Sequence, residues 1–406
     1  MEVQTVDTLP PVAADHDPVR CLLAIELSKK SWIVAITTAL SDKISQYTLD
    51  GCDWKGLLEL MERIRTRVAR EMGRPVEMIS CYEAGYDGFW LHRPLERHGV
   101  RSHVIDPASV QVDRRARRAK TDHIDAKRLL RSLMAYLRGE PKVWSVLRVP
   151  SVAEEDDRRL HRERDRLIAE RGQHVNRIKG LCAIHGIYDY EPMRRDRMLR
   201  LEQLHTGDGR ELPLRLKAEI ARELQRLELI LGMLKEIEAE RDAIALTENV
   251  SAHPNANKIQ NLVKLKAIGA EIATVLTGEV FYRRCNNRHQ VASYVGLTPS
   301  PFQSGRKCRD QGISKAGNPK ARSTMIELAW LWLRHQPDSP VSIWFRERVG
   351  TLKGRIRRIT IVAVARKLLI ALWRYLETGM VPTGAREREW NPEDPIKGTC
   401  RSKVDV

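Results

Sequence analysis

Two short apolar segments in the first third of the chain each carry a glutamate at their end. The first is CLLAIEL, with Glu26, and the second is EMISCYE, which ends on Glu83. Short apolar runs bounded by polar residues are typical of buried strands. A carboxylate at the end of such a strand is costly unless something compensates it. The pattern therefore predicts a sheet whose strand ends present acids that need a partner.

The segments around these two runs alternate between strand-like and helix-like patterns. Strands are expected at 21–27, 31–38, 44–49, 77–83 and 100–106, and helices at 54–72, 89–99 and about 122–137. The first three strands form a meander. The order β-β-β-α-β-α-β-α is that of an RNase H-like fold, so we expect this fold for residues 21–150.

Two further acids, Asp122 and Asp125, lie three residues apart in KTDHIDAKRLL. At this spacing they share one face of a helix. Together with Glu26 and Glu83 they could hold Mg²⁺ or Mn²⁺, because Mg²⁺ prefers oxygen ligands. Two such ions, about 4 Å apart, can activate an attacking oxygen and stabilise a leaving one. The alternative is that Asp122 caps the helix and Asp125 is a surface carboxylate.

Residues 151–250 are dense in charge and poor in β-formers. Within 213–245, apolar residues recur at spacings of three and four, which is a heptad-like stripe. The stripe consists of Leu216, Ile220, Leu224, Leu227, Leu231, Leu234 and Ile237. It predicts a helical hairpin or coiled coil that separates two catalytic parts. The stripe would serve self-association or pack within its own chain.

A mainly helical third part is expected from 251 to 382, after a disordered lead-in (1–20), the domain at 21–150 and the helical linker at 151–250. Residues 262–280 resemble a helix-hairpin-helix with a tight turn at 268–270, although a plain helical hairpin fits too. Residues 346–374 hold nine Lys or Arg and one Glu, a candidate surface for tracking a nucleic-acid backbone. Residues 383–406 are expected to be a loose tail.

The basic segment GLTPSPFQSGRKCRDQGISKAGN contains Ser304. A hydroxyl needs a base, a metal or strong electrostatic help to attack phosphorus. Gly305 permits close backbone approach, and the neighbouring cations can stabilise charge on the transition state. A hydrogen-bonding role is the ordinary one for a loop serine, and Ser300 and Ser314 are local competitors. His289 and His335 are possible bases for which we expect structural roles.

Composition agrees with a polyanionic partner. The 406 residues include 70 Lys and Arg against 53 Asp and Glu, a formal net charge of +17. Such an excess favours nucleic acid. No apolar run approaches the roughly 18 residues of a membrane span, and the acidic, Pro-bearing N-terminus resembles no signal or transit peptide. The seven cysteines form no C-x-x-C pair, so we expect a reducing cytoplasm.

At these residues the sequence resembles the DEDD transposases of the insertion-sequence one-ten family, relatives of the Piv DNA invertase. The N-terminal resemblance rests on LLAIELSKKSW, YEAGYDGFWLHRPLERHGVRSHVIDP and KTDHIDAKRLL. The C-terminal resemblance rests on LKAIGAEIATVLTGEV, ASYVGLTPSPFQSGRKCRDQGISKAGNPKAR and VAVARKLLIALWRYL. Together these segments cover most of residues 21–380.

The resemblance implies a RuvC-like N-terminal domain, a coiled coil and a C-terminal transposase domain. Its four metal-binding acids map onto Glu26, Glu83, Asp122 and Asp125, and its nucleophilic serine onto Ser304. It implies DNA cutting and joining through a phosphoserine without a nucleotide cofactor, by a homo-oligomer of two to four copies in a prokaryotic, nucleoid-associated setting. A noncoding bridge RNA would pair with donor and target DNA. Expected nucleic-acid contacts are Lys120, Arg306, Lys307, Arg309, Lys315 and Arg322.

One departure concerns the first acid, which is usually Asp in this family and is Glu26 here. The longer side chain can still reach a metal, over a looser arm. Two alternatives stay open: a metal-dependent nuclease of the Holliday-junction type that uses the acids alone, and an inactive nucleic-acid-binding relative.

Overall fold

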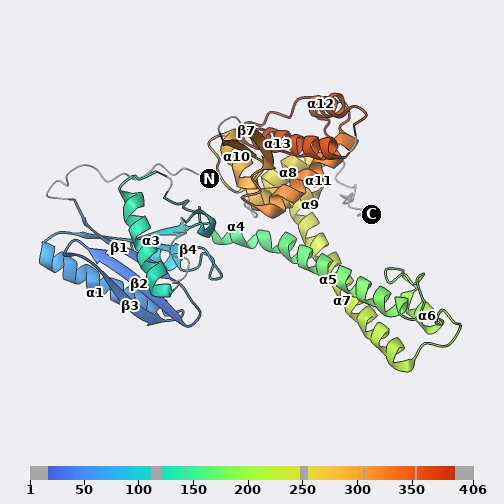
Figure 1. The fold of residues 1–406 in the computed structure, drawn as a ribbon, viewed down its shortest axis with the longest axis horizontal. Helices are drawn as coiled ribbons and strands as arrows, with labels where there is room; N and C mark the ends of the chain where they lie inside the picture. Colours follow the sequence, from blue (N-terminus) through green and yellow to red (C-terminus); the bar gives the residue numbers. More distant parts are fainter. Residues whose placement is uncertain are drawn as a thin grey trace. The chain divides into compact units, whose positions relative to one another are not determined.

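The computed structural model describes residues 17–110, 121–141, 143–246, 255–304, 307–352 and 354–388. The chain divides into two compact units, Met1–Pro150 and Ser151–Val406, whose elements are labelled in Figure 1.

Unit 1 is a mixed α/β unit with the element order that the sequence predicts. Both helices α1 and α3 have the predicted bounds, whereas β3 is longer and α2 shorter than expected. The elements are β1 (Val19–Glu26), β2 (Ser31–Thr38), β3 (Ser41–Asp50), α1 (Trp54–Met72), β4 (Val76–Glu83), α2 (His92–Arg97), β5 (Val100–Ile105), the 3₁₀ turn η1 (Pro107–Ser109) and α3 (Asp122–Leu137).

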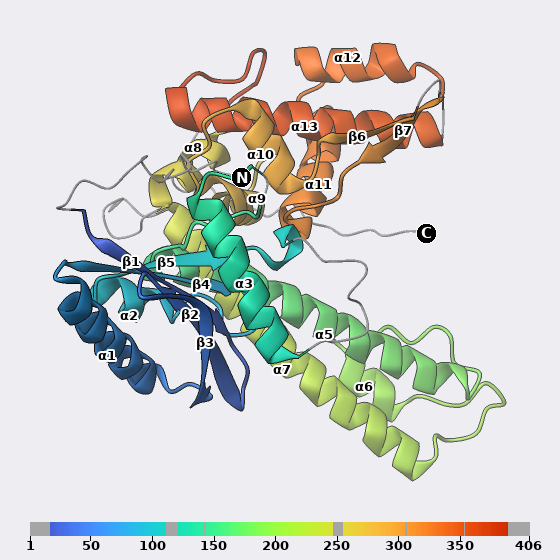
Figure 2. The same cartoon turned by 60° about the vertical axis from the view of Figure 1, so that its left-hand side comes forward.

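The five strands form one sheet in the order β3-β2-β1-β4-β5. The predicted meander is confirmed, because β2 is antiparallel to both β1 and β3. Strands β4 and β5 extend the sheet in parallel beside β1. Figure 2 shows this sheet with α1 on one side and α3 lying across the strands on the other.

Alternating residues of β1 separate the two sides of the sheet, as strand geometry requires. Leu23 and Ile25 belong to the core that contains Leu57 of α1. Ala24 belongs to the core that contains Leu129 of α3. All these side chains are fully buried or nearly so. The central strands are therefore apolar on both faces, which explains their continuous apolar sequence.

Unit 2 is mainly helical, as expected. Its elements are α4 (Val152–Asp156), α5 (Arg158–Ala183), α6 (Arg197–Glu202), α7 (Leu214–Leu246), α8 (Ala256–Lys264), α9 (Ala270–Leu276), the π-helical turn η3 (Thr277–Phe281), α10 (Arg288–Val295), β6 (Pro299–Ser304), β7 (Lys307–Ile313), α11 (Pro319–His335), α12 (Pro340–Val349) and α13 (Arg355–Thr378).

Helices α5 and α7 pack against each other as a long antiparallel hairpin (Figure 1). Of the predicted stripe on α7, all members are buried except Leu231, which is partly buried. Ion pairs from Arg164 to Glu238 and from Arg177 to Glu223 join the two helices further. In this chain the stripe thus packs against α5, and self-association stays a prediction.

The remaining helices of unit 2 surround one large core that includes Trp332 of α11 and Leu368 of α13. Helices α8 and α9 are joined by a short turn, as predicted for residues 262–280. The residue in the left-handed conformation is Ala267, with φ 86°, whereas Gly269 has φ −94° and precedes α9. The turn therefore lies slightly earlier than the sequence suggests.

Two parts of unit 2 differ from expectation. The segment expected to be a basic loop is a two-stranded antiparallel ribbon, β6–β7. Within the expected loose tail, Glu387 pairs with Leu265 in a β-bridge, and the Arg388 amide donates to the Lys264 carbonyl. None of the helices that the structure describes combines the length and apolar character needed to cross a membrane.

Candidate active site

The two strand glutamates lie side by side. In the register of the parallel strands, Ile25 of β1 is opposite Tyr82 of β4, so Glu26 and Glu83 are the next pair along. Neighbouring strands are about 4.8 Å apart. Glu26 follows Ala24 by two residues, and Glu83 follows Cys81 by two residues. Ala24 and Cys81 both pack in the core beneath α3. Strand alternation therefore places both glutamates on the α3 side of the sheet.

Helix α3 crosses the strands at that side. Gln46 Nε2 of β3 donates to the His123 carbonyl at 2.7 Å, and the Cys81 thiol donates to the Leu129 carbonyl at 3.9 Å. Further along α3, the ring centroid of Tyr136 lies 5.7 Å from that of His103. Their strand partners share one row of the sheet: Gln46, Ala35, Ala24, Cys81 and His103.

The two aspartates occupy different environments on the first turn of α3. Asp125 is 7% exposed, and its Oδ1 lies 2.8 Å from Arg128 Nη2. Asp122 is exposed. The helix is capped by Thr121, whose Oγ1 accepts from the Ile124 amide at 3.3 Å. The alternative in which Asp122 caps the helix is therefore wrong, and so is a surface position for Asp125.

Glu26, Glu83 and Asp125 thus lie on the same side of the sheet. The glutamates lie about 7 Å beyond the row that α3 crosses, since two strand residues span that length. Among the residues that the structure describes, no three His, Cys, Asp or Glu side chains come close enough to hold one metal ion. The donor type suits Mg²⁺, and the metal site itself stays a prediction.

Ser304 is the last residue of β6 and is paired in register with Lys307, the first residue of β7. It therefore stands at the tip of the β6–β7 ribbon, at the last residue pair of the two strands. Lys307 and Arg309 belong to β7. The predicted contact residues Lys120 and Arg306 lie outside the described residues, as does Gly305.

The base of the ribbon is closed by backbone hydrogen bonds between the segments that enter and leave it. The Ser314 amide donates to the Thr298 carbonyl at 2.8 Å, and the Asn318 amide donates to the Tyr294 carbonyl at 2.9 Å. A Cβ on Gly317 would lie 2.2 Å from the Tyr294 oxygen, and the φ of Gly317 is 115°. Only glycine allows this approach.

Two predicted contact residues lie at this base. Lys315 is exposed and has φ 56°, a conformation that is uncommon for residues other than glycine. Arg322 Nη1 donates to the carbonyls of Val295 and Lys315 at 3.1 and 3.0 Å. Arg322 therefore holds the base of the ribbon together, a role that its basic character alone did not indicate.

The competing residues have local roles. The Ser314 hydroxyl accepts from Thr298 Oγ1 at 3.3 Å. His289 lies in the first turn of α10, where its amide donates to Asn287 Oδ1. Burial lowers the pKa of His335, which ends α11. The contact of His289 is consistent with a structural role, and the role of His335 stays a prediction.

Sequence reasoning missed one buried polar cluster in unit 2. Glu279 of η3 is 3% exposed and accepts hydrogen bonds from Arg162 on α5 and Asn318 beside α11. Its Oε1 also lies 2.8 Å from His161 Nε2. The available signal was a lone acid in the otherwise apolar segment TVLTGEVF, which requires a compensating partner.

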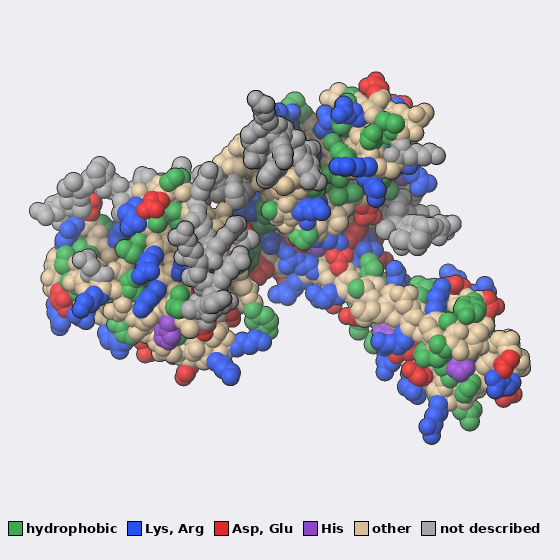
Figure 3. Space-filling model, viewed as in Figure 1, with side chains coloured by type: hydrophobic (Ala, Val, Ile, Leu, Met, Phe, Trp, Pro, Cys, Tyr) green, Lys and Arg blue, Asp and Glu red, His purple; other side chains and the backbone are tan. Residues whose placement is uncertain are grey.

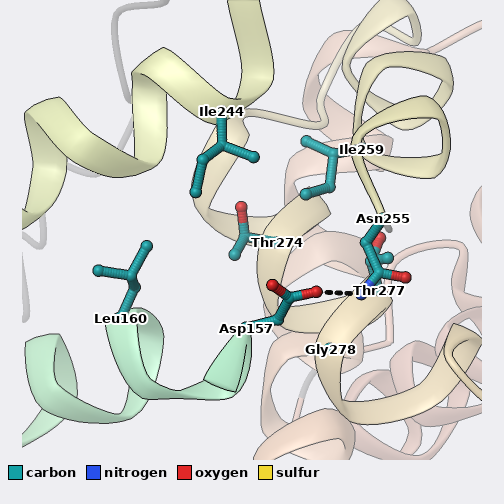
Figure 4. Close-up of a pocket in the computed structure, with 8 residues that line it drawn as sticks. All are labelled: Asp157, Leu160, Ile244, Asn255, Ile259, Thr274, Thr277 and Gly278. Atoms are coloured by element: carbon teal, nitrogen blue, oxygen red, sulfur yellow. Dashed lines mark hydrogen bonds between the residues drawn. The ribbon is translucent and has the colours of Figure 1, made fainter. Parts of the chain in front are cut away.

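Next to this cluster is a small cavity, shown in Figure 4. Asn255 Nδ2 donates to Asp157 Oδ2 at 2.6 Å on its edge, and the hydroxyls of Thr274 and Thr277 have no hydrogen-bond partner among the described residues. The space open to the centre of a water molecule is about 10 Å³, roughly enough for one water. The cavity is too small for a substrate.

A larger hollow of about 440 Å³ lies in unit 1, lined by residues that include Trp54, Arg65 and His98. Its lining residues Leu58 and Met61 belong to α1, which covers the sheet face opposite α3. The hollow is thus separated from the acids by the sheet. In Figure 3, Lys and Arg side chains are spread over both units, with acidic residues interspersed on the helical hairpin.

Comparison with known proteins adds independent information. Residues 259–341 match the family described as "Transposase IS116/IS110/IS902 family". A Sinorhizobium fredii protein named "Putative transposase y4rJ" is 48% identical over 381 residues, covering 92% of this chain and 96% of that protein. "Transposase for insertion sequence element IS1111A" of Coxiella burnetii is 25% identical over 313 residues, covering 74% and 77%. The matched family segment contains both Ser304 and Glu279.

Proposed function

Because the chain belongs to the IS116/IS110/IS902 family of insertion-sequence transposases, we propose that it cuts and rejoins DNA through a covalent bond to Ser304. The observation that carries this proposal is the position of Ser304 at the tip of the β6–β7 ribbon, within the segment matched to the family. A ribbon tip can enter a DNA groove and deliver a hydroxyl to the backbone.

In the proposed reaction, Ser304 Oγ bonds to phosphorus as its proton leaves, and the bond from phosphorus to one DNA oxygen breaks. That oxygen takes up a proton and becomes a free hydroxyl. A hydroxyl from the partner strand then attacks the phosphoserine and regenerates the serine. One phosphoester replaces another at each step, so the chemistry needs no nucleotide cofactor.

The acids of unit 1 are proposed to serve the same phosphate. Glu26, Glu83, Asp122 and Asp125 would hold Mg²⁺ or Mn²⁺, which supplies Lewis-acid stabilisation of a phosphoryl oxygen. Support comes from the neighbouring positions of the two glutamates and from the burial of Asp125. Arg128 neutralises Asp125 in this structure, so loading a metal requires that ion pair to rearrange.

The acids belong to unit 1 and Ser304 to unit 2. A composite site therefore needs the two units to meet, in one chain or between copies in a dimer or tetramer. A noncoding guide RNA is a further proposed partner. The protein is also proposed to act at the nucleoid. The excess of basic residues supports a nucleic-acid partner, and Lys315, Lys307 and Arg309 are the proposed phosphate contacts near the serine.

The test is Ser304→Ala in the full-length protein, with Ser300→Ala as the matched control on the same strand. DNA carrying an end label is incubated with Mg²⁺ or Mn²⁺ and run on denaturing gels. Wild type and Ser300→Ala should retain label on the protein, whereas Ser304→Ala should retain none and form no joined product. Joining by Ser304→Ala at the wild-type rate would overturn the serine mechanism.

The neighbouring glutamates also favour a second candidate, a metal-dependent nuclease that activates water with the acids alone. It predicts cleavage without protein-bound label, and unchanged cleavage by Ser304→Ala. An inactive relative predicts salt-sensitive DNA binding with no cleavage. In that case Glu26→Asp, which supplies the family's usual first acid, should create activity.

A further inference from the structure

The base of the β6–β7 ribbon is tied to helix α5 by a buried carboxylate. Glu279 Oε1 lies 2.8 Å from His161 Nε2 and accepts from Arg162 Nε at 2.8 Å. Glu279 Oε2 accepts from Arg162 Nη2 at 3.1 Å and from Asn318 Nδ2 at 2.8 Å. One carboxylate therefore joins three segments that are distant in the sequence, and both of its oxygens are used.

Asn318 transmits this connection to the ribbon. Its side-chain Oδ1 accepts from the Ala321 amide at 3.1 Å and so caps α11. Its own amide donates to the Tyr294 carbonyl at 2.9 Å, which closes the base of the ribbon. The side-chain Nδ2 is the group that reaches Glu279. Asn318 thus fixes the start of α11, the closure of the ribbon and the distance to α5 at once.

A second contact joins the same two helices one turn further along. Lys320 Nζ of α11 lies 2.6 Å from Asp165 Oδ1 of α5. Asp165 follows Arg162 by three residues, so both lie on one face of α5. The start of α11 is therefore held against α5 at two points, one buried and one partly exposed.

The buried contact is electrostatically strong. Burial raises the pKa of Glu279, but the hydrogen bonds from His161 and Arg162 lower it well below its ordinary value. The group is thus ionised, and its hydrogen bonds are charge-assisted and directional. A buried ion pair is weak evidence for stability, because an apolar replacement can be equally stable. Its directionality makes it suited to holding a geometry.

We propose that Glu279 is a positioning residue for Ser304: it holds the base of the serine ribbon against α5 and so sets where the ribbon tip stands. This inference rests on the proposed role of Ser304. It assigns the helical hairpin a part in the reaction, because α5 provides the fixed support for the ribbon.

The test compares three full-length variants. Glu279→Gln keeps the shape and removes the charge. Asn318→Asp keeps an oxygen that can cap α11 but places a second carboxylate beside Glu279. Glu238→Gln is the matched control, because Glu238 also accepts from an α5 arginine, Arg164, at 2.8 Å but lies on α7, away from the ribbon.

Two quantities are measured for each variant: DNA affinity, and the single-turnover rate of forming the protein-bound DNA label. Glu279→Gln and Asn318→Asp should each lower the rate of label formation at least about tenfold, which corresponds to about 1.4 kcal/mol of activation free energy. The DNA affinity of both variants should stay within about twofold of wild type. Glu238→Gln should change neither. Unchanged rates in both Glu279→Gln and Asn318→Asp would overturn the proposal. An equal loss of rate in Glu238→Gln would overturn it too.

Amide hydrogen exchange provides a readout that is independent of DNA chemistry. In Glu279→Gln and Asn318→Asp, exchange should rise about tenfold at the ribbon-closing amides of Ser314 and Asn318, and stay unchanged in unit 1 and in Glu238→Gln. If exchange rises in the two variants while even wild type forms no protein-bound label, the proposed serine function fails, but the role of Glu279 in holding the ribbon base against α5 is supported. Unchanged exchange in both variants would overturn that role of Glu279. If Glu279→Gln does not fold, Asn318→Asp decides alone.

Discussion

The two units position their candidate residues in different ways. In unit 1, Glu26 and Glu83 are placed by the backbone register of two parallel strands that pair over seven residues each, so this main-chain ladder would have to change before the two glutamates separated. In unit 2, Ser304 lies on a two-stranded ribbon whose base is closed by a few backbone hydrogen bonds and anchored by side chains, chiefly those of Glu279, Asn318 and Arg322. Single polar substitutions should therefore leave the arrangement of the two glutamates intact and disturb the position of the ribbon.

The largest effect is expected where charge is removed from the strand ends. Glu26→Gln and Glu83→Gln should each lower DNA joining about 1000-fold, because metal-held charge stabilises the transition state by several kcal/mol. The free energy of unfolding should change by less than about 0.5 kcal/mol, as for other substitutions outside the core. Joining assays and urea titrations measure the two. Large unfolding changes would show that the glutamates hold the sheet together, which would break the comparison.

The next effect concerns the helical hairpin that supports the ribbon. Leu224 is 1% exposed in the core shared by α5 and α7. Leu224→Ala should destabilise unit 2 by about 2–5 kcal/mol through lost burial and a residual cavity. Leu229 on the same helix is 61% exposed, so Leu229→Ala serves as the control with little effect. Equal losses in both would indicate that the exposed face of α7 is covered by a partner in solution.

The Glu279 cluster should make the stability of unit 2 fall as the pH becomes acidic. The folded-state pKa of Glu279 lies below its ordinary value of 4.5, so the stability that it adds is complete above pH 4.5 and lost as the pH falls through the folded-state pKa. Glu279→Gln should therefore cost about 2 kcal/mol at neutral pH, the size of hydrogen bonds to a charged group. The difference in Tm between the two proteins should shrink below pH 4.5. A constant difference would contradict the cluster's role.

The smallest effect is expected at the caps. Thr121 caps α3 in unit 1, and Asn318 caps α11 in unit 2. Thr121→Ala should cost about 1 kcal/mol, the usual value of an N-cap, and leave joining within a few-fold. Asn318→Ala should cost more, because it also removes the bond to Glu279. Thermal unfolding of the two variants measures the two losses of stability. Equal losses would show that the Asn318 bond to Glu279 adds nothing to the stability of unit 2.

Much of unit 1 could be predicted because its signals are local. Helices α1 and α3 have an apolar face against the sheet and a capping residue, Asp53 or Thr121, at the predicted start. The strands of the sheet are short apolar runs. The neighbouring positions of their two carboxylates follow from the parallel pairing of β1 with β4, which the element order along the chain does not state. The side-chain conformations that would complete a metal site depend on contacts such as Asp125 with Arg128, which no periodicity encodes.

The ribbon and the Glu279 contacts of unit 2 were harder to predict from the sequence, for two physical reasons. The β6 and β7 segments, PSPFQS and KCRDQGI, contain Pro, Gly and charged residues and show no strand-like alternation, so the ribbon is specified by closure at its base. Glu279 meets partners that lie 118 and 39 residues away in the sequence. A lone acid in an apolar stretch announces that a partner exists but not which one.

The helical hairpin contains two separate apolar clusters, one near the ribbon with Leu167 and Leu234, and one farther along with Ile178 and Leu224. Only the nearer part of α5 carries Arg162 and Asp165. A change in the length of the outer hairpin by whole turns on both helices should therefore leave the contacts of Arg162 and Asp165 beneath the serine ribbon unaltered.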